Sequence, residues 1–222
     1  MHYAHKICFL ALAACLLAAV PLGMSGCATA SIAMKERLGY AKREQLVDGV
    51  QKARDAQEQA KEQFTSALEE FIAVTQVDAG ELEATYSRLN TAYESSKKRA
   101  GKVRDRIASV ERVANALFKE WEAELNEYSS ETLRASSQQQ LDATRMQYNG
   151  LLRAMKKAEG TMDPVLEAFA DQVLFLKHNL NARAIASLEG TVGELEAEIG
   201  VLIRDMEASI AEANAFIDSM GS

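Results

Sequence analysis

The sequence predicts an all-α protein, an elongated antiparallel helical bundle or coiled coil of about four long helices. The 222-residue chain contains only two prolines, Pro21 and Pro164, whereas the many turns of a sheet-rich fold favour proline and glycine. Apolar residues recur at alternating spacings of four and three, as they do in helices that supercoil around one another. With 48% hydrophobic and 26% charged residues, the composition is that of a folded domain.

The first 26 residues predict a cleaved signal peptide. A short segment that contains Lys6 precedes an apolar run over residues 7–20, and Met24-Ser25-Gly26-Cys27 closes the segment. A positive start, a short apolar core and small residues before a cleavage site are typical of a secretory signal. Met24-Ser25-Gly26-Cys27 resembles the bacterial lipobox, whose cysteine is lipidated. The alternatives are an ordinary signal peptide that leaves a free thiol, and an N-terminal anchor that is not cleaved.

The cysteine count favours lipidation. Cys8 and Cys15 lie inside the predicted signal peptide, so the mature chain keeps Cys27 alone and forms no internal disulfide. Ala28 follows Cys27, and by the sorting rule of Gram-negative lipoproteins the absence of Asp there implies the outer membrane. The predicted domains are residues 1–26 as the lipoprotein signal peptide, 27–37 as the lipidated N-terminus and tether, and 38–222 as a single helical coiled-coil domain.

The first long helix is predicted from four heptads that end at Val74. Its core-type positions are Leu46, Val50, Ala53, Gln57, Ala60, Phe64, Ala67, Phe71 and Val74. One alternate set is mostly alanine, and such small residues let a partner helix approach closely. Asp78 and Glu81 form an Asp-x-x-Glu capping box beside Gly80, which predicts a helix end and a new helix start.

The second helix repeats this pattern. Its core-type positions are Leu82, Tyr86, Leu89, Tyr93, Ser96, Ala100, Val103, Ile107, Val110, Ala114, Leu117 and Trp121. We expect the first two helices, each about 70 Å long, to fold back on each other as an antiparallel hairpin. Tyr128-Ser129-Ser130 predicts the next break, with a serine as N-cap.

A third helix is predicted over residues 131–159 and a fourth over residues 164–219. Gly160 suits a C-cap, and Asp163 and Pro164 suit the start of the next helix. Because these two helices differ in length, either the fourth bends between Asn179 and Gly193, or it extends past the third and pairs with the first two. We expect one long, slightly kinked fourth helix.

Two charged runs predict how the helices are arranged. Residues 97–112 contain seven Lys or Arg against Asp105 and Glu111, and residues 189–212 contain seven acidic residues against Arg204. Opposite flanking charges orient neighbouring helices, so we expect the second helix to lie beside the end of the fourth. Contact of the basic run with anionic lipid or peptidoglycan is the alternative.

The sequence lacks the usual signs of catalysis. It has no Gly-x-x-x-x-Gly-Lys loop, Gly-x-Gly-x-x-Gly turn or Gly-x-Ser-x-Gly elbow. His178 is the single histidine of the predicted mature chain, and Phe175 stands where a Glu-x-x-His metal motif needs glutamate. We therefore predict no enzymatic activity, no cofactor and no metal site. The excess of 32 Asp+Glu over 25 Lys+Arg also predicts no nucleic-acid partner.

The least ordinary segment is a polar turn at residues 177–183. It contains Lys177, His178, Asn179, Asn181 and Arg183. Asparagine is a poor helix former unless its side chain hydrogen-bonds to a neighbour. The segment is therefore a candidate for a buried polar layer that fixes helix register, or for the docking site of a partner. Trp121 lies on the heptad seam and is expected to pack in the core.

The mature chain resembles an uncharacterised family of Gram-negative bacterial lipoproteins, known only as a domain of unknown function. The resemblance rests on Lys42-Arg43-Glu44-Gln45-Leu46-Val47 and on residues 163–166, 171–188 and 205–210. It implies an envelope lipoprotein and no particular mechanism. The chain is also superficially similar to the small murein lipoprotein. It ends in Ser219-Met220-Gly221-Ser222, however, without the terminal lysine that bonds that protein to the cell wall.

From these observations we expect an outer-membrane lipoprotein on the periplasmic side, anchored through Cys27, that acts as a structural spacer or as an adaptor for other envelope proteins. The alternative is a helical carrier whose helices open to hold an apolar ligand or lipid. The heptads leave a homo-oligomer open, because they do not distinguish a seam within one chain from a seam between chains.

Overall fold

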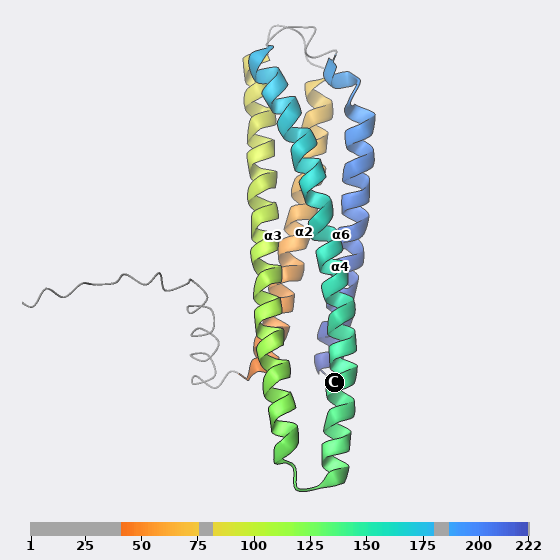
Figure 1. Cartoon of the computed structure of the whole chain (residues 1–222). Helices are drawn as coiled ribbons and strands as arrows, with labels where there is room; N and C mark the ends of the chain where they lie inside the picture. The colour runs from red at the N-terminus through yellow and green to blue at the C-terminus, as the bar shows by residue number, and fades with distance from the viewer. Residues whose placement is uncertain (1–40, 76–81, 180–186, 222) are drawn as a thin grey trace, which may run out of the picture.

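The computed structural model describes residues 41–75, 82–179 and 187–221, and its secondary structure there is helical. The elements are α2 (Lys42–Val74), α3 (Leu82–Glu124), the short 3₁₀ helix η1 (Leu125–Glu127), α4 (Glu131–His178) and α6 (Val192–Gly221). Each long helix runs antiparallel to its neighbours, and the 48 residues of α4 span about 72 Å (Figure 1). The predicted all-α, elongated antiparallel bundle is confirmed.

The four long helices stand at the corners of a square. α2 packs against α3, α3 against α4, α4 against α6, and α6 closes the ring against α2. α3 and α6 therefore occupy opposite corners (Figure 1). The expectation that the basic run of α3 lies beside the acidic run of α6 is wrong, because each helix of an up-down bundle packs beside the helix that follows it, which places the second and fourth on a diagonal.

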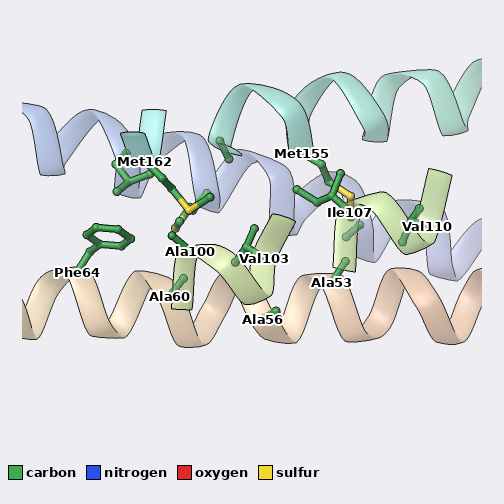
Figure 2. Close-up of a cluster of buried hydrophobic side chains, with 14 of the residues drawn as sticks. Ala53, Ala56, Ala60, Phe64, Ala100, Val103, Ile107, Val110, Met155 and Met162 are labelled. Carbon is green, nitrogen blue, oxygen red and sulfur yellow. The ribbon is translucent and has the colours of Figure 1, made fainter. Parts of the chain in front are cut away.

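A continuous apolar core runs along the bundle. All nine predicted core positions of α2 are buried, from Leu46 to Val74. Figure 2 shows Ala53, Ala56 and Ala60 of α2 facing the part of α3 that carries Val103 and Ile107. Of the predicted seam of α3, Tyr86, Tyr93 and Trp121 are only partly buried but still pack against this core.

The helix break predicted at Gly160 and Pro164 does not occur, because α4 continues through both residues. Pro164 lacks the N–H that would bond to the carbonyl of Gly160, and an interior proline costs about 3 kcal/mol. The buried positions continue at the same alternating spacing on both sides: Met155, Ala158, Met162, Val165 and Phe169. Burial of each large apolar side chain contributes about 1.5–3 kcal/mol, so the continuous seam outweighs the lost hydrogen bond.

The chain instead leaves the helix after His178. The backbone N–H of Asn179 donates to the carbonyl of Leu176 at 3.2 Å, and its Nδ2 donates to the carbonyl of Phe175 at 3.0 Å. Through these two bonds Asn179 satisfies two of the last carbonyls of α4, so that the helix can end here. The single kinked helix expected over residues 164–219 is therefore wrong, and α4 and α6 are separate helices that pack antiparallel.

The break after α3 agrees with the prediction. Tyr128 is extended, and Ser130 is the N-cap of α4, accepting a hydrogen bond at Oγ from the N–H of Leu133 at 3.4 Å. The 43 residues of α3 span about 65 Å, but α2 has only 33 residues and about 50 Å, less than expected. The predicted capping box at Asp78 and Glu81, with Gly80, lies outside the described residues.

The two ends of the bundle differ. At one end Lys42 pairs with Glu120 at 2.8 Å and Arg43 donates to the carbonyl of Met220 at 2.7 Å, so α2 begins where α6 ends. Beyond this level, which Glu120 of α3 and Met146 of α4 mark, these two helices continue as a two-helix hairpin extension, residues 121–145 (Figure 1). We call this the hairpin end, and the opposite end, where α4 finishes at His178, the turn end. No described helix combines the length and apolarity that crossing a bilayer requires.

Candidate functional site

The described part of the predicted polar turn lies at the turn end of the bundle. Lys177 and His178 are exposed in the last turn of α4, and Asn179 is its half-buried C-cap. Exposed side chains cannot form a buried register layer, so these residues do not serve as one. Asn181 and Arg183 lie outside the described residues, as does Cys27.

An open groove lies beside these residues, and we call it the turn-end groove. It has a volume of about 470 Å³ and is lined by Asp171, Gln172, Leu174, Phe175, His178, Asn179, Ser187 and Thr191. Leu174 is 55% exposed and Phe175 is 40% exposed, which is unusual for large apolar side chains in this tightly packed bundle. The groove offers a partner both apolar surface and hydrogen-bonding groups.

A buried polar pair that was not predicted lies between α2 and α6. Ser209 Oγ donates to Gln57 Oε1 at 3.0 Å, and both side chains are fully buried. One turn away on α6, Asp205 Oδ1 accepts from Lys157 Nζ of α4 at 2.7 Å. A glutamine at a core-type heptad position is a sequence signal for Gln57, whereas nothing local in the sequence indicates its partner on another helix.

Three titratable groups of the described helices have pKa values shifted away from neutrality. A hydrogen bond to Glu58 raises the pKa of Lys61. Burial lowers the pKa of Lys156, but Glu159 and Glu111 outweigh it, so that pKa lies above its usual value. Burial raises the pKa of Tyr148 to about 12, helped by the charge of Glu111. None of these groups is tuned for proton transfer near neutral pH.

The described helices do not gather metal ligands. Within residues 41–75, 82–179 and 187–221, no three or more His, Cys, Asp or Glu side chains are grouped to hold a metal ion. His178, the histidine of these ranges, is exposed at the end of α4.

A model of a protein family matches most of the chain. The model of a family described as "Protein of unknown function (DUF2959)" matches residues 32–220. The match spans all four long helices, including the turn-end groove and the buried pair between α2 and α6. No curated protein and no solved structure matches the chain. The chain therefore belongs to the DUF2959 family, whose function is unknown.

Proposed function

We propose that this protein is a non-enzymatic envelope lipoprotein, anchored through Cys27 on the periplasmic side of the outer membrane, that acts as an adaptor or spacer. The anchor is supported by the apolar run over residues 7–20, the lipobox-like Met24-Ser25-Gly26-Cys27, and the single cysteine that remains after cleavage. Each buried methylene of a lipid contributes about 0.8 kcal/mol, so several acyl chains hold far more firmly than one.

The order of the helices sets how the elongated bundle is oriented relative to the membrane. Residues 28–41 join Cys27 to the start of α2, which lies at the hairpin end, so a lipid on Cys27 keeps that end nearest the membrane. α4 then runs about 72 Å to the turn end. The turn-end groove is presented away from the membrane, where another envelope protein can reach it.

The exposure of Leu174 and Phe175 in the turn-end groove is the observation that carries the adaptor function. Apolar side chains that a packed domain leaves in an open groove are typical of a binding surface. A carrier of apolar ligands would use the interior instead. There, Phe64, Phe71 and Phe169 are at most 2% exposed and pack with their neighbours, which supports the adaptor over the carrier.

The anchor is tested by feeding cells an alkyne-labelled fatty acid and comparing the full chain with Cys27→Ser. We expect label on the native protein in the outer-membrane fraction and none on the variant. A native protein without label would contradict the anchor.

The adaptor is tested in cells with a photocrosslinking amino acid at Leu174, with Leu133 as the matched control. Leu133 is 59% exposed in the first turn of α4, at the hairpin end, and lines none of the grooves found among the described residues. We expect a discrete adduct with one envelope protein from position 174, absent from position 133 and lost when Phe175 is also changed to Asp. Equal adducts from both positions, or lipid bound to the purified bundle without any adduct, would contradict the adaptor.

A further inference from the structure

α3 and α6 carry opposite charge on opposite sides of the bundle (Figure 1). We call the exposed cations of residues 97–119 in α3 the basic face and the exposed glutamates of α6 the acidic face. The basic face comprises Lys97, Lys98, Lys102, Arg112 and Lys119, with the exposed Asp105 among them, and the acidic face comprises Glu194, Glu196, Glu207 and Glu212. The charged runs noted in the sequence therefore do not neutralise each other within one molecule.

Most of these charges are not used inside the bundle. Lys97 Nζ lies 5.7 Å from the ring centre of Tyr93, and Glu207 lies 3.8 Å from Lys61. Within the described ranges, the remaining members of both faces form no ion pair at 4 Å or less. Each face thus keeps free charge for a partner of the opposite sign.

The two faces lie at the same height along the rod. Lys156 of α4 contacts Glu111 of α3 at 3.3 Å, and the adjacent Lys157 contacts Asp205 of α6 at 2.7 Å. Because α3 and α6 both run antiparallel to α4, they run in the same direction. Glu111 of α3 and Asp205 of α6 therefore lie at similar height along the bundle. Lys102 lies on α3 between Glu111 and the turn end, and Glu196 lies on α6 between Asp205 and the turn end, again at similar height.

The surface between the glutamates of α6 consists mostly of small apolar side chains. Its exposed residues there are Ala197, Val201, Ala208, Ala211 and Ala215, with the exposed cation Arg204 among them. Lysine and arginine can lay their apolar stems along the small residues while their charged ends reach carboxylates at the edges. On either side of Arg204, the acidic face therefore suits long cationic side chains in shape as well as in charge.

We propose that the basic face of one copy binds the acidic face of a second copy, with the two rods side by side and parallel. This inference rests on the proposed function for one point, because anchors in one membrane give all copies the same orientation and level. Since every copy presents the two faces on opposite sides, the contact is heterologous and repeats into rows rather than closing as a two-fold dimer.

The association is expected to be weak in dilute solution and stronger on a membrane. Exposed ion pairs are individually weak and are screened over about 8 Å at physiological salt. Confinement of tethered copies to a surface raises their effective concentration without new contacts. The rows should therefore form on vesicles at low salt and weaken as salt is raised.

The test uses the full lipidated chain in phosphatidylcholine vesicles and a zero-length reagent that couples amines to carboxylates in contact. One variant reverses the basic face (Lys98→Glu, Lys102→Glu, Arg112→Glu) and a second reverses the acidic face (Glu194→Lys, Glu196→Lys, Glu212→Lys). A control changes exposed charges on other helices (Glu69→Lys, Arg153→Glu). All six reversed positions are exposed, and thermal unfolding verifies that each variant is folded.

We expect the native chain and the control to give a ladder of crosslinked species, reduced at least fivefold in 0.5 M NaCl. Each reversed variant alone should lose the ladder at least fivefold, and an equal mixture of the two should recover at least half of it, because their reversed faces are again complementary. Absence of a native ladder overturns the proposal. The proposal is also overturned if only the basic-face variant loses the ladder and the mixture of the two variants does not recover it. That result would point to an anionic partner other than this chain.

The outcome is separable from that of the proposed function. Mass spectrometry of the purified protein reports whether Cys27 carries lipid. If Cys27 is bare, the anchor is wrong, and the same mixing experiment at millimolar concentration in low salt still decides whether the two faces bind each other.

Discussion

Ser209 donates a hydrogen bond to Gln57 across the interface of α2 and α6, at 3.0 Å and with both side chains fully buried. The pair interrupts an otherwise apolar seam, and Gln57 Nε2 has no hydrogen-bond partner among the described residues. Burying two polar side chains costs less free energy when they hydrogen-bond to each other. The pair therefore favours the register of α2 and α6 that brings Gln57 and Ser209 together over a register in which one helix is shifted by a turn.

Removing one member of this pair should cost more than removing both. Ser209→Ala leaves the buried amide of Gln57 without its partner, and we expect the free energy of unfolding to fall by about 1–2 kcal/mol. The double variant Gln57→Leu with Ser209→Ala replaces the polar pair by apolar groups and should be at least as stable as the native chain. Urea unfolding of the two single variants and the double variant measures the coupling.

Ser96→Ala is the matched control for that cycle. Ser96 is also buried, but its hydroxyl donates to the carbonyl of Ala92 in its own helix at 2.9 Å. Its removal leaves no side chain on another helix unpaired, so the loss should stay below about 0.5 kcal/mol. Equal losses for Ser96→Ala and Ser209→Ala would contradict a special role of the pair between helices.

Gly160→Ala should stabilise the protein. Gly160 is exposed within the continuous helix α4, and a Cβ added there would meet nothing within 4 Å. Replacing an interior helix glycine by alanine contributes about 0.5–1 kcal/mol. Thermal unfolding should show a raised midpoint. A lowered midpoint would instead indicate that Gly160 caps a helix end, as its sequence context suggests.

The sequence was sufficient for the seam and insufficient for the connections. Every predicted seam position of α2 is buried, because burial follows the spacing of apolar residues directly, although Gln45 and Ala56 are buried as well. The break at Pro164 was predicted wrongly. Met162 and Val165 on either side of it are buried against other helices, and the local turn signals do not show how much this burial stabilises a continuous helix. The reversal after His178 had a signal in Asn179, but its strength depends on hydrogen bonds that only the fold creates.

The candidate site was predictable only in part. His178 and Asn179 were singled out from composition, and the structure places both in the lining of the turn-end groove. Leu174 lies between the buried Val173 and Leu176 and off the seam, so its exposure agrees with the heptad spacing. The groove around it was not predictable, because Ser187 and Thr191 beyond the end of α4 complete its lining. The pairing of Gln57 with Ser209 joins residues far apart in sequence, which no local pattern specifies.

The hairpin extension should open before the rest of the bundle unfolds. In residues 121–145 only α3 and α4, among the described helices, pack together, held by Leu125, Leu141 and a hydrogen bond from Trp121 Nε1 to Ser137 Oγ at 2.8 Å. Few buried contacts give low local stability. Because Trp121 is the one tryptophan of the chain, its fluorescence should change at lower urea concentration than the helical circular dichroism.

Ser137→Ala sharpens this test. It removes the partner of Trp121 and should lower the urea midpoint of the fluorescence change while leaving the midpoint of the circular dichroism unchanged. Coincident fluorescence and dichroism curves for the native chain would show that the hairpin extension unfolds together with the four-helix part.

Tyr148 should make the bundle less stable above pH 10. Its ring lies between Phe118 and Phe216, with centroid distances of 5.4 and 6.4 Å, and burial raises its pKa to about 12 from an ordinary value of 10.0. The folded state favours the neutral phenol of Tyr148, and this preference stabilises the fold fully below pH 10. The stabilisation is lost as pH rises from 10 to 12, because the phenol of Tyr148 ionises at lower pH in the unfolded chain than in the fold.

Tyr148→Phe isolates this effect, since phenylalanine keeps the ring contacts and removes the titrating group. Between pH 10 and 12 the native chain should lose about 2 kcal/mol more unfolding free energy than the variant, as measured by urea unfolding at fixed pH steps. Other tyrosines and the lysines titrate in both proteins and cancel in this difference. Parallel pH profiles for the two would mean that the phenol of Tyr148 ionises as readily in the fold as in water.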